Sequence, residues 1–467
     1  MTLFGTGDPR PIHFMGVGGA GMSGLALLAT QQGLAVTGCD NDPSGAADLA
    51  ALGVVVQRGH DPRHVEGARA LIVTAAVPGQ HPEVERARAQ GIPVIRRADA
   101  LGQVVSGGTL VAVAGTHGKT TTTVMVTEAL TAAGRNPTGL AGGRVAQWGG
   151  NARIGGQELY VVEADEFDRA FLSLHPTVAV VTNVEADHLE CYGSMAALED
   201  AFREFASRAT RVIVGWDDAG ARRLAEQLSN PVWTFGLEGD ADIRLIDPTL
   251  EVGTSRARVR LPQSGPGERE EVEVSLRVPG LHNLRNAAAA LGVVRALGAD
   301  VRSALEALAR FSGVARRFEH VGDVDGVTIV DDYAHHPTEV AATLAAARQR
   351  FPGRRLVAVF QPHLFSRTAL HGDALGRSLA AADVAVIAPI YAAREQPMAG
   401  VTAEIVARGA VRAGAATVAV RDRPALVERV AALVRPGDVI LTLGAGDITR
   451  VGYELSAQFQ RPAGARE

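Results

Sequence analysis

The sequence predicts an α/β protein of three domains, each built on a largely parallel sheet covered by helices. Short apolar runs alternate with segments of helical periodicity almost from end to end, the order typical of parallel strands joined by crossover helices. A chain of 467 residues is also longer than one hydrophobic core usually organises. The alternation restarts after residues 106–108 and again after residues 311–313. We therefore expect domains at residues 1–106, 107–313 and 314–467.

The expected elements follow this alternation in chain order. The first domain should contain strands at 12–15, 35–39, 71–74 and 92–95, with helices at 22–32 and 83–90. The second should contain strands at 109–114, 158–162 and 177–181, a helix from Lys119, and a β-hairpin formed by 256–261 and 271–278 around a turn at 263–268. The third should contain strands at 327–331, 356–360, 384–388 and 439–443.

Composition excludes several classes of protein. Hydrophobic residues make up 46% of the chain and charged residues 21%, a balance that a disordered or fibrous protein does not have. The net charge of −5 argues against a protein that coats nucleic acid. No segment resembles a signal peptide or reaches the roughly 20 apolar residues that span a bilayer, so we expect a cytoplasmic protein without membrane insertion. The two cysteines, Cys39 and Cys191, are expected to be buried space-filling thiols and form no disulfide framework.

One basic residue stands apart from the others. Lys and Arg together number 46, yet Lys119 is the single lysine. GC-rich coding explains a preference for arginine, but it does not explain why one lysine is kept. The position of Lys119 inside a glycine-containing loop suggests a functional reason.

That loop, Gly115-Thr-His-Gly-Lys-Thr-Thr121, lies between a predicted strand and a predicted helix. A phosphate-binding loop needs small residues for a tight curl, a flexible cation for the β- and γ-phosphates, and a hydroxyl for Mg²⁺. Gly118, Lys119 and Thr120 supply these in the required order. The usual first glycine would fall at Val113, so this is a variant loop in which Gly115 makes the early turn.

A second glycine-rich turn, Gly16-Val-Gly-Gly-Ala-Gly21, follows the first predicted strand and opens a helix. Such glycines let the backbone approach a diphosphate at a helix N-terminus. Asp40 ends the next strand, where a ribose-binding acid would lie in a dinucleotide fold. The motif suits NAD, FAD or any nucleotide diphosphate, and a tight turn without a ligand is the alternative.

Acid-rich loops follow two strands of the second domain, with the sequences Glu163-Ala-Asp-Glu166 and Asn183-Val-Glu-Ala-Asp-His188. Ligands bind at the carboxyl ends of strands in open α/β sheets, and carboxylates near a phosphate-binding loop usually hold Mg²⁺. Solvated acidic loops are the alternative for each segment taken alone.

Two polar groups lie further along the chain. Asn283 and Asn286 are one turn apart at the start of a predicted helix, where an asparagine can also act as an N-cap. Residues 331–337 and 361–367 place two carboxylates and three histidines after strands of the third domain. Their spacing matches no zinc template, so polar contacts to a substrate are favoured over metal ligation.

These motifs together resemble the Mur ligase family. The resemblance rests on HFMGVGGAGMSG, AGTHGKTTTT, VVEADEFDRAFL, VTNVEADH, VPGLHNLRNA, ARRFE, VDDYAHHPTEV, AVFQPH with SRT, and LTLGAGDIT, which occur in the family's order over nearly the whole chain. It implies a Rossmann-like UDP-binding domain, a central P-loop ATPase-like domain and a Rossmann-like C-terminal domain. It further implies ATP-dependent joining of L-alanine to the lactyl carboxylate of UDP-N-acetylmuramate through an acyl phosphate, a step of peptidoglycan precursor synthesis that uses two Mg²⁺ ions.

The resemblance also implies roles for individual residues. The catalytic residues would be Lys119, Glu163 and His188. Mg²⁺ would be held by Thr120, Glu163 and His188. ATP would be bound by Gly115, Thr116, His117, Gly118, Lys119, Thr120, Thr121, Asn283, Arg317 and Asp332. The UDP substrate would lie against Gly18, Gly19, Ala20, Gly21 and Asp40. The amino-acid side would be formed by Tyr333, His335, His336, His363 and Arg367.

The chain departs from the family pattern at three places. Phe167 lies where a serine often follows the E-A-D-E motif, and Leu364 lies where arginine is common. Residues 189–210 contain no lysine, so the carbamylated lysine that supports the second Mg²⁺ in some relatives has no counterpart. The second ion would then depend on His188, substrate oxygens and water.

Three other functions remain open at this point. A related recycling ligase joins UDP-N-acetylmuramate to a preformed tripeptide. A nicotinamide-dependent dehydrogenase could be built on the first glycine motif, although the P-loop and its acidic partners argue against it. A nucleotide switch would bind ATP without catalysis. The sequence leaves the choice between monomer and dimer open.

Overall fold

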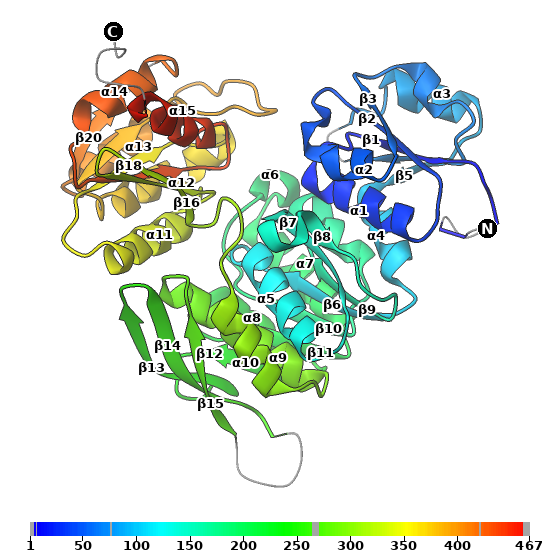
Figure 1. The fold of residues 1–467 in the computed structure, drawn as a ribbon, viewed down its shortest axis with the longest axis horizontal. Helices are drawn as coiled ribbons and strands as arrows, with labels where there is room; N and C mark the ends of the chain where they lie inside the picture. The colour runs from blue at the N-terminus through cyan, green and yellow to red at the C-terminus, as the bar shows by residue number, and fades with distance from the viewer. Residues whose placement is uncertain (1–3, 6, 75–76, 264–269, 420–421, 461–467) are drawn as a thin grey trace. The chain divides into compact units, whose positions relative to one another are not determined.

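The computed structural model describes residues 4–5, 7–74, 77–263, 270–419 and 422–460. These residues form three sheets with helices packed against them (Figure 1). The chain divides into two compact units, one comprising Met1–Asp247, Arg258–Val274 and Arg285–Arg310, the other comprising Pro248–Ala257, Ser275–Leu284 and Phe311–Glu467. The first two sheets belong mainly to the first unit and the third sheet to the second unit.

The first sheet has five strands in the order β3-β2-β1-β4-β5, and every pairing is parallel. This is the nucleotide-binding order, in which a ligand site lies where the strand order reverses beside β1. The strands are β1 (Ile12–Met15), β2 (Val36–Asp40), β3 (Val55–Arg58), β4 (Ala70–Val73) and β5 (Val94–Arg96). The helices are α1 (Ala20–Gln31), η1 (Pro43–Ala46), α2 (Ala47–Ala51), η2 (Pro62–Val65), α3 (Pro82–Ala89) and α4 (Arg97–Val105).

The second sheet has ten strands in the order β15-β14-β13-β12-β11-β10-β6-β9-β7-β8. Its strands are β6 (Thr109–Ala114), β7 (Thr138–Val145), β8 (Gly150–Arg153), β9 (Leu159–Glu163), β10 (Val178–Val181), β11 (Arg211–Gly215), β12 (Val232–Gly236), β13 (Ile243–Glu251), β14 (Thr254–Arg260) and β15 (Glu271–Leu276). Its helices are α5 (Lys119–Ala132), η3 (Ala146–Trp148), η4 (Phe167–Ser173), α6 (Leu189–Tyr192), α7 (Met195–Ser207), α8 (Ala219–Gln227), α9 (Leu281–Ala296) and α10 (Val301–Arg310).

The third sheet has six strands in the order β16-β17-β21-β18-β19-β20, antiparallel only between β16 and β17. Its strands are β16 (Glu319–Val324), β17 (Val327–Asp332), β18 (Leu356–Phe360), β19 (Val384–Ile387), β20 (Ala416–Ala419) and β21 (Val439–Leu443). Its helices are α11 (Pro337–Arg350), α12 (Phe365–Leu379), α13 (Glu404–Arg412), α14 (Ala425–Leu433) and α15 (Thr449–Phe459).

Strand β18 shows why apolar runs without alternation predicted these strands. All five of its residues are buried. Ala358 and Phe360 belong to the core on one face of the sheet, whereas Val357 and Val359 belong to the core on the other. A parallel sheet covered by helices on both faces removes every side chain from water, so the strand has no polar face.

The predicted elements are confirmed to within a few residues at their ends, and β6, β18 and β21 match the expected bounds. The strands of the predicted hairpin appear as β14 and β15, which are neighbours in the sheet. Residues 264–269 of its turn lie outside the described residues. One apolar core runs from Ile12 to Leu224 and includes residues on both sides of the boundary expected at 106, so the first two sheets share a core. The domain boundaries stay predictions.

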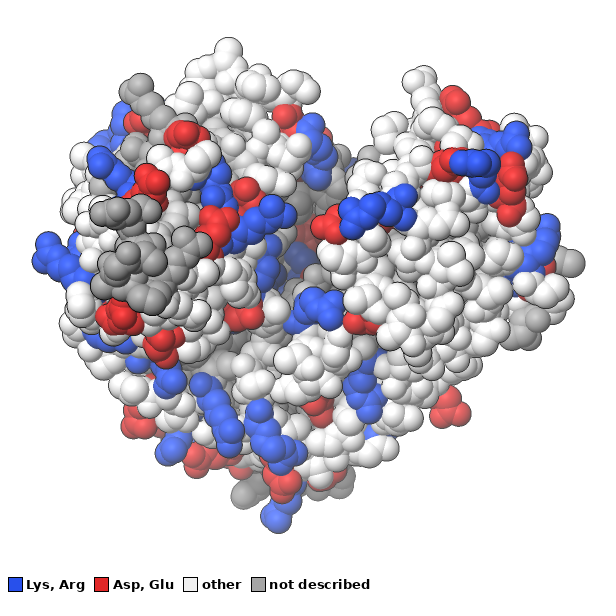
Figure 2. Space-filling model, turned by 45° about the horizontal axis from the view of Figure 1, so that its top comes forward, with Lys and Arg blue, Asp and Glu red and all other residues white. Residues whose placement is uncertain are grey.

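The surface drawn in Figure 2 carries basic and acidic side chains in mixed order. Among the helices of the described ranges, none combines the length and the apolar character that crossing a bilayer would require.

The shared core gives a first prediction. The Phe202 side chain is fully buried and packs edge-on against Phe171, with their ring centroids 5.2 Å apart. Replacing it in Phe202→Ala should lower the free energy of unfolding of the first unit by about 3–5 kcal/mol, because the space left behind cannot collapse completely. Denaturant unfolding followed by circular dichroism measures this loss. Leu52→Ala, at a residue of the same unit that is 46% exposed, should cost under about 1 kcal/mol. Equal losses in the two variants would contradict the assignment of Phe202 to the core.

Candidate active site

The predicted phosphate-binding loop connects β6 to α5 and depends on two glycines with positive φ. Gly115 has φ +126°, and a Cβ atom there would overlap the side chain of Thr182. Gly118 has φ +81° and precedes the first residue of α5, and a Cβ atom there would lie 2.8 Å from Asn286 Oδ1. Both positions therefore require glycine for conformation and for space. The loop ends at a helix N-terminus, where backbone N–H groups suit an anion.

Lys119 folds back over this loop. Its Nζ donates to the carbonyl oxygens of Gly115 at 2.7 Å and Thr116 at 3.2 Å, and to Glu166 Oε1 at 2.9 Å. Both charged side chains are largely buried, with exposed fractions of 15% for Lys119 and 2% for Glu166. The second oxygen, Glu166 Oε2, is buried and has no hydrogen-bond partner among the described residues.

The surrounding carboxylates decide the charge of Lys119. Burial opposes the ammonium form, but Glu166, Asp165 and Glu163 outweigh this effect and raise the pKa of Lys119. Burial also raises the pKa of Glu166, against the opposing effects of Lys119 and His188. Lys119 therefore remains a cation, held in a water-poor site where its charge acts strongly.

Thr120 and Glu163 meet at the start of the same helix. The Thr120 hydroxyl donates to Glu163 Oε1 at 3.0 Å, and the Gly142 N–H donates to Glu163 Oε2 at 2.5 Å. The carboxylate lies at the end of β9, which is the direct neighbour of β6 in the sheet. A hydroxyl and a carboxylate oxygen beside a phosphate-binding loop are the hard ligands that Mg²⁺ prefers.

The loop after β10 holds the phosphate-binding loop in place. Asn183 Oδ1 accepts from the His117 N–H at 2.8 Å, and Asn183 Nδ2 donates to the His117 carbonyl at 3.2 Å. The Glu185 N–H donates to the Thr116 hydroxyl at 2.9 Å. These bonds connect two loops at the carboxyl ends of neighbouring strands.

His188 ends the same acidic segment with φ +53°, a left-handed conformation that is uncommon outside glycine. Its Nδ1 lies 3.4 Å from Glu190 Oε1, its Nε2 lies 3.8 Å from Asp187 Oδ2, and its ring meets Phe167 edge-on at 5.2 Å. Phe167, the residue that departs from the family pattern, thus contacts this predicted ligand.

The glycine turn after β1 is braced by Asp40. Asp40 Oδ2 accepts from the Gly18 N–H at 2.9 Å, and Asp40 Oδ1 accepts from the Asp42 N–H at 2.8 Å. A Cβ atom at Gly21 would lie 2.8 Å from Arg97 Nη1, so this guanidinium lies directly against the turn. Asp40 therefore positions the turn, while its predicted role toward a ribose stays a prediction.

The five residues predicted for the amino-acid side all lie in the second unit, and four of them lie close together. Tyr333 and His335 meet edge-on at 5.2 Å, and the His335 and His363 rings lie 6.3 Å apart. Arg367 Nη1 lies 3.0 Å from His363 Nδ1, and His363 stacks on Tyr391 at 5.8 Å. These aromatic and basic side chains form one polar cluster, contributed by the segments after β17, β18 and β19 and by the start of α12.

His336 occupies a different environment from this cluster. It is buried, caps the N-terminus of α11 through the Thr338 N–H, and packs on His371 with ring centroids 4.7 Å apart. These contacts suit a residue that positions α11, and its predicted place on the amino-acid side stays a prediction.

Arg317 and Asp332 lie close to Tyr333 in the same unit. The Arg317 guanidinium lies over the Tyr333 ring at 5.0 Å. Burial raises the pKa of Asp332 to about 6, and its carboxylate accepts 2.8 Å bonds from the N–H groups of Phe318 and Ala334. Asn283, at the start of α9, donates to the Pro279 carbonyl at 2.7 Å.

Sequence reasoning left Glu166 and Arg97 without a role, although both contact a predicted loop. Glu166 is part of the acidic segment 163–166, but nothing in the sequence indicated that its carboxylate would contact Lys119. No pattern in the sequence connected Arg97 to the glycine turn, because the contact joins the start of α4 to the start of α1.

The single lysine makes the Lys119–Glu166 pair directly testable. Glu166→Gln removes the carboxylate that most favours the ammonium, so the pKa of Lys119 should fall. Acylation consumes the neutral amine, and one pKa unit changes its population tenfold. We expect the rate of Lys119 acylation, divided by that of the α-amino group of the same chain, to rise near pH 8, as measured by peptide mass spectrometry.

Glu158→Gln is the matched control, because Glu158 is exposed and lies just before β9. This variant should leave the ratio unchanged. An unchanged ratio in Glu166→Gln would show that the pair does not set the charge of Lys119.

Comparison with known proteins places all three sheets in one family. Residues 11–109 match "Mur ligase family, catalytic domain", residues 113–294 match "Mur ligase middle domain" and residues 316–446 match "Mur ligase, glutamate ligase domain". A UDP-N-acetylmuramate--L-alanine ligase of Thermobifida fusca is 44% identical over 458 residues and covers 95% of both chains. The corresponding ligase of Rubrobacter xylanophilus is 43% identical and covers 96% of this chain and 100% of its own.

Solved structures agree with this assignment. The UDP-N-acetylmuramate-alanine ligase of Thermotoga maritima has a TM-score of 0.82 at 29% identity and covers 97% of this chain and 99% of its own. A murein peptide ligase of Psychrobacter arcticus, at 24% identity, shares the fold with a TM-score of 0.73 over 97% of this chain and 99% of its own. The strand orders, the phosphate-binding loop and these full-length matches lead to one conclusion: the chain belongs to the Mur ligase family and has its three-domain α/β architecture.

Proposed function

We propose that this protein joins L-alanine to the lactyl carboxylate of UDP-N-acetylmuramate at the expense of ATP, a step of peptidoglycan precursor synthesis. The observation that carries the proposal is the phosphate-binding loop, where Lys119 and Thr120 each contact a carboxylate from the loop beside it. The substrates follow from relatives that carry this activity in their names at 43–44% identity over nearly the full chain. Such nucleotide substrates also favour a cytoplasmic place of action.

The chemistry requires an activated carboxyl group, because a free carboxylate is a poor electrophile. Transfer of the γ-phosphoryl group of ATP to the lactyl carboxylate gives an acyl phosphate and ADP. The amine of L-alanine then attacks the acyl carbon, phosphate leaves, and an amide bond forms. Most of the catalysis in such a transfer comes from positioning and from neutralising charge.

Lys119 supplies the neutralising charge in this scheme. Its ammonium contacts two carbonyl oxygens of the loop and Glu166, so it is already desolvated and oriented. We propose that phosphate oxygens take over part of this contact set when ATP binds. Because the Lys119 ammonium is already removed from water, binding ATP requires little further desolvation of it. Its positive charge can then stabilise the γ-phosphoryl group during transfer.

The donor set at the same loop fits Mg²⁺. Thr120 and Glu163 provide a hydroxyl and a carboxylate, and the buried Glu166 Oε2, which has no partner among the described atoms, provides a further acceptor for metal-bound water. We propose that Thr120 and Glu163 hold one ion and that His188 contributes to a second. Bound Mg²⁺ would neutralise phosphate charge and help to align the phosphoryl group.

The remaining predicted residues divide among the three substrates. We propose that the glycine turn braced by Asp40 faces the UDP diphosphate, with Arg97 as an added cationic contact. The amino-acid side would be served by Tyr333, His335, His336, His363 and Arg367. ATP would be served by Asn283, Arg317 and Asp332.

Phosphate release tests the proposed reaction. The protein is incubated with ATP, Mg²⁺ and UDP-N-acetylmuramate, together with L-alanine, an L-alanyl tripeptide or no amine. We expect release that depends on L-alanine. Phosphate release that requires the tripeptide and does not occur with L-alanine would assign the recycling activity. Release in the absence of any amine, or no release under any condition, would contradict the proposed ligase activity.

Lys119→Ala should reduce the L-alanine-dependent turnover by about 100-fold or more, because no other lysine exists to replace its charge at the phosphates. Steady-state phosphate release measures this loss. Arg203→Ala, on α7 with a half-exposed side chain, is a control that should keep wild-type turnover. Near-normal turnover in Lys119→Ala would remove the basis of the proposed ATP site.

A further inference from the structure

A group of metal-ligating side chains lies in the first domain, outside everything used above. We call it the His13 cluster, and it comprises His13, Cys39, His60, His64 and Glu83. Its members come from β1, β2, the segment after β3 and helix α3. Cys39 is buried, as the sequence predicted, but it faces imidazole and carboxylate groups where a space-filling thiol would face apolar side chains.

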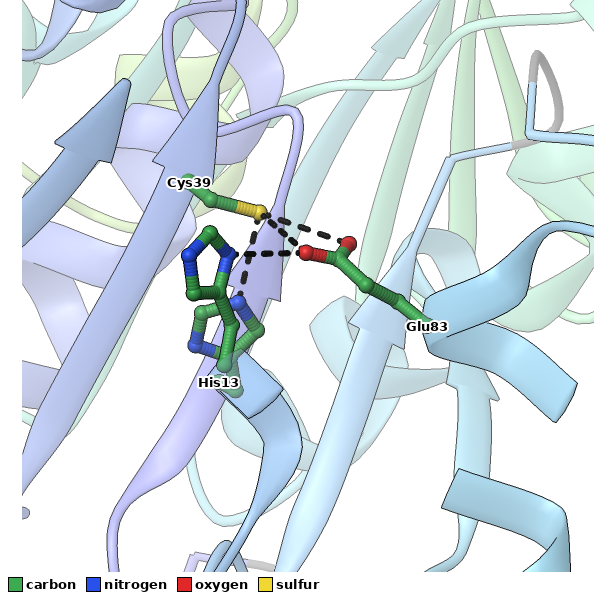
Figure 3. Close-up of side chains that lie close together, drawn as sticks. His13, Cys39 and Glu83 are labelled. Atoms are coloured by element: carbon green, nitrogen blue, oxygen red, sulfur yellow. Dashed lines mark hydrogen bonds and ion pairs between the residues drawn. The ribbon is translucent and has the colours of Figure 1, made fainter. Parts of the chain in front are cut away.

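The donor atoms of this cluster point at one another. Figure 3 shows the Cys39 thiol directed from its strand toward the ring of His13 and toward the carboxylate of Glu83, which reaches in from a helix. Cys39 Sγ lies 3.3 Å from His13 Nε2 and 3.4 and 3.5 Å from the two Glu83 oxygens. His64 Nδ1 lies 2.9 Å from Glu83 Oε1. One donor atom from each of these four residues lies within 4.8 Å of all the others.

His60 adds a fifth donor at the edge of the cluster. Its Nδ1 lies 3.3 Å from Cys39 Sγ and 3.4 Å from Glu83 Oε2. Its side chain is 20% exposed, whereas that of Glu83 is fully buried. The cluster therefore has a closed interior and one member at its solvent side.

Hydrogen bonds alone do not account for the way these donor atoms converge. The thiol carries one hydrogen, yet Cys39 Sγ contacts two imidazole nitrogens and both oxygens of one carboxylate. The carboxylate of Glu83 has ion-pair partners only in His60 and His64 among the described residues, and neither carries a permanent charge. A buried carboxylate without a lasting cation is costly.

The ligands are also prepared by their surroundings. His13 Nδ1 lies 2.8 Å from the Thr37 hydroxyl, and the Asp61 N–H donates to Glu83 Oε1 at 3.0 Å. Partners of this kind orient ligands around metal ions. A metal ion would bind the neutral form of the His13 imidazole and the thiolate form of Cys39.

We propose that the His13 cluster binds one divalent d-block cation of the zinc type, through His13 Nε2, Cys39 Sγ, His64 Nδ1 and Glu83, with His60 able to replace or join a ligand at the rim. Ligands about 2.0–2.3 Å from a tetrahedral ion lie about 3.2–3.8 Å apart. The Cys39–His13, Cys39–Glu83 and His64–Glu83 donor pairs are separated by 2.9–3.5 Å, and the remaining pairs lie within 4.8 Å. A mixed set of sulfur, nitrogen and oxygen donors selects such an ion over Mg²⁺. A dication with one thiolate and one carboxylate leaves no net charge buried.

The site would be structural, because four protein ligands close a tetrahedral shell. The Cys39 carbonyl accepts from the N–H groups of Gly16 at 2.8 Å and Val17 at 3.1 Å. The same residue would thus hold the metal through its side chain and the start of the glycine turn through its backbone. The metal would stabilise the turn proposed for the UDP diphosphate without contacting that substrate.

Co²⁺ provides the decisive probe, because thiolate ligation gives an intense near-ultraviolet charge-transfer band. Full-length protein is dialysed against a chelator and titrated with Co²⁺, then with Zn²⁺. We expect about one equivalent of Co²⁺ to produce the band, Zn²⁺ to abolish it, and Zn²⁺ to raise the unfolding midpoint by at least about 3 °C. A titration without a thiolate band would overturn the proposal.

The two cysteines supply a matched pair of variants. Cys39→Ser should lose the band, whereas Cys191→Ser should keep it, because Cys191 lies on α6 outside the cluster. A band that survives in Cys39→Ser, or that disappears in Cys191→Ser, would place the metal elsewhere and reject the site. If Cys39→Ser fails to fold by circular dichroism, His64→Gln decides, with an expected loss of Co²⁺ affinity of at least about tenfold. Unchanged affinity in His64→Gln would likewise reject the site.

Discussion

The candidate active site depends on one buried ion pair, the contact between the Lys119 ammonium and the Glu166 carboxylate at 2.9 Å. Taking both charges out of water is expensive, and the carbonyl oxygens of the phosphate-binding loop complete the solvation of the ammonium. The pair joins the loop after β6 to the loop after β9, two strands that are parallel neighbours. The protein thus keeps a desolvated cation in position at a helix N-terminus, where an anionic phosphate binds best.

The same design recurs around both nucleotide-type loops. Glu163, at the end of β9, accepts hydrogen bonds from Thr120 and Gly142. Asp40, at the end of β2, accepts from Gly18 in the glycine turn. In each case a carboxylate at the end of one strand fixes the loop that follows its neighbour. Parallel pairing makes this geometry available, since it brings the carboxyl ends of adjacent strands to one edge of the sheet.

In the first sheet, the end of strand β2 contributes side chains to two different proposed sites. On β2, Asp40 turns toward the glycine turn while the adjacent Cys39 turns toward His13 and Glu83, because successive side chains of a strand point to opposite faces. One strand end therefore contributes both to the proposed diphosphate site and to the proposed metal site. Backbone bonds from Gly16 and Val17 to Cys39 connect the two, so the stability of one affects the other.

The α/β class, most strand positions and the two phosphate-type loops could be predicted from the sequence, because continuous apolar runs and glycine spacing are local properties of a chain. The sequence also singled out Lys119, since that lysine has no other of its kind. Which side chains meet became visible in the folded chain alone: Glu166 pairs with Lys119, Arg97 lies against Gly21, His336 caps a helix, and Cys39 faces histidines and a glutamate. These contacts join residues from separate strands and loops. They depend on the order of the strands in the sheet and on the register between them, and no local sequence pattern specifies either.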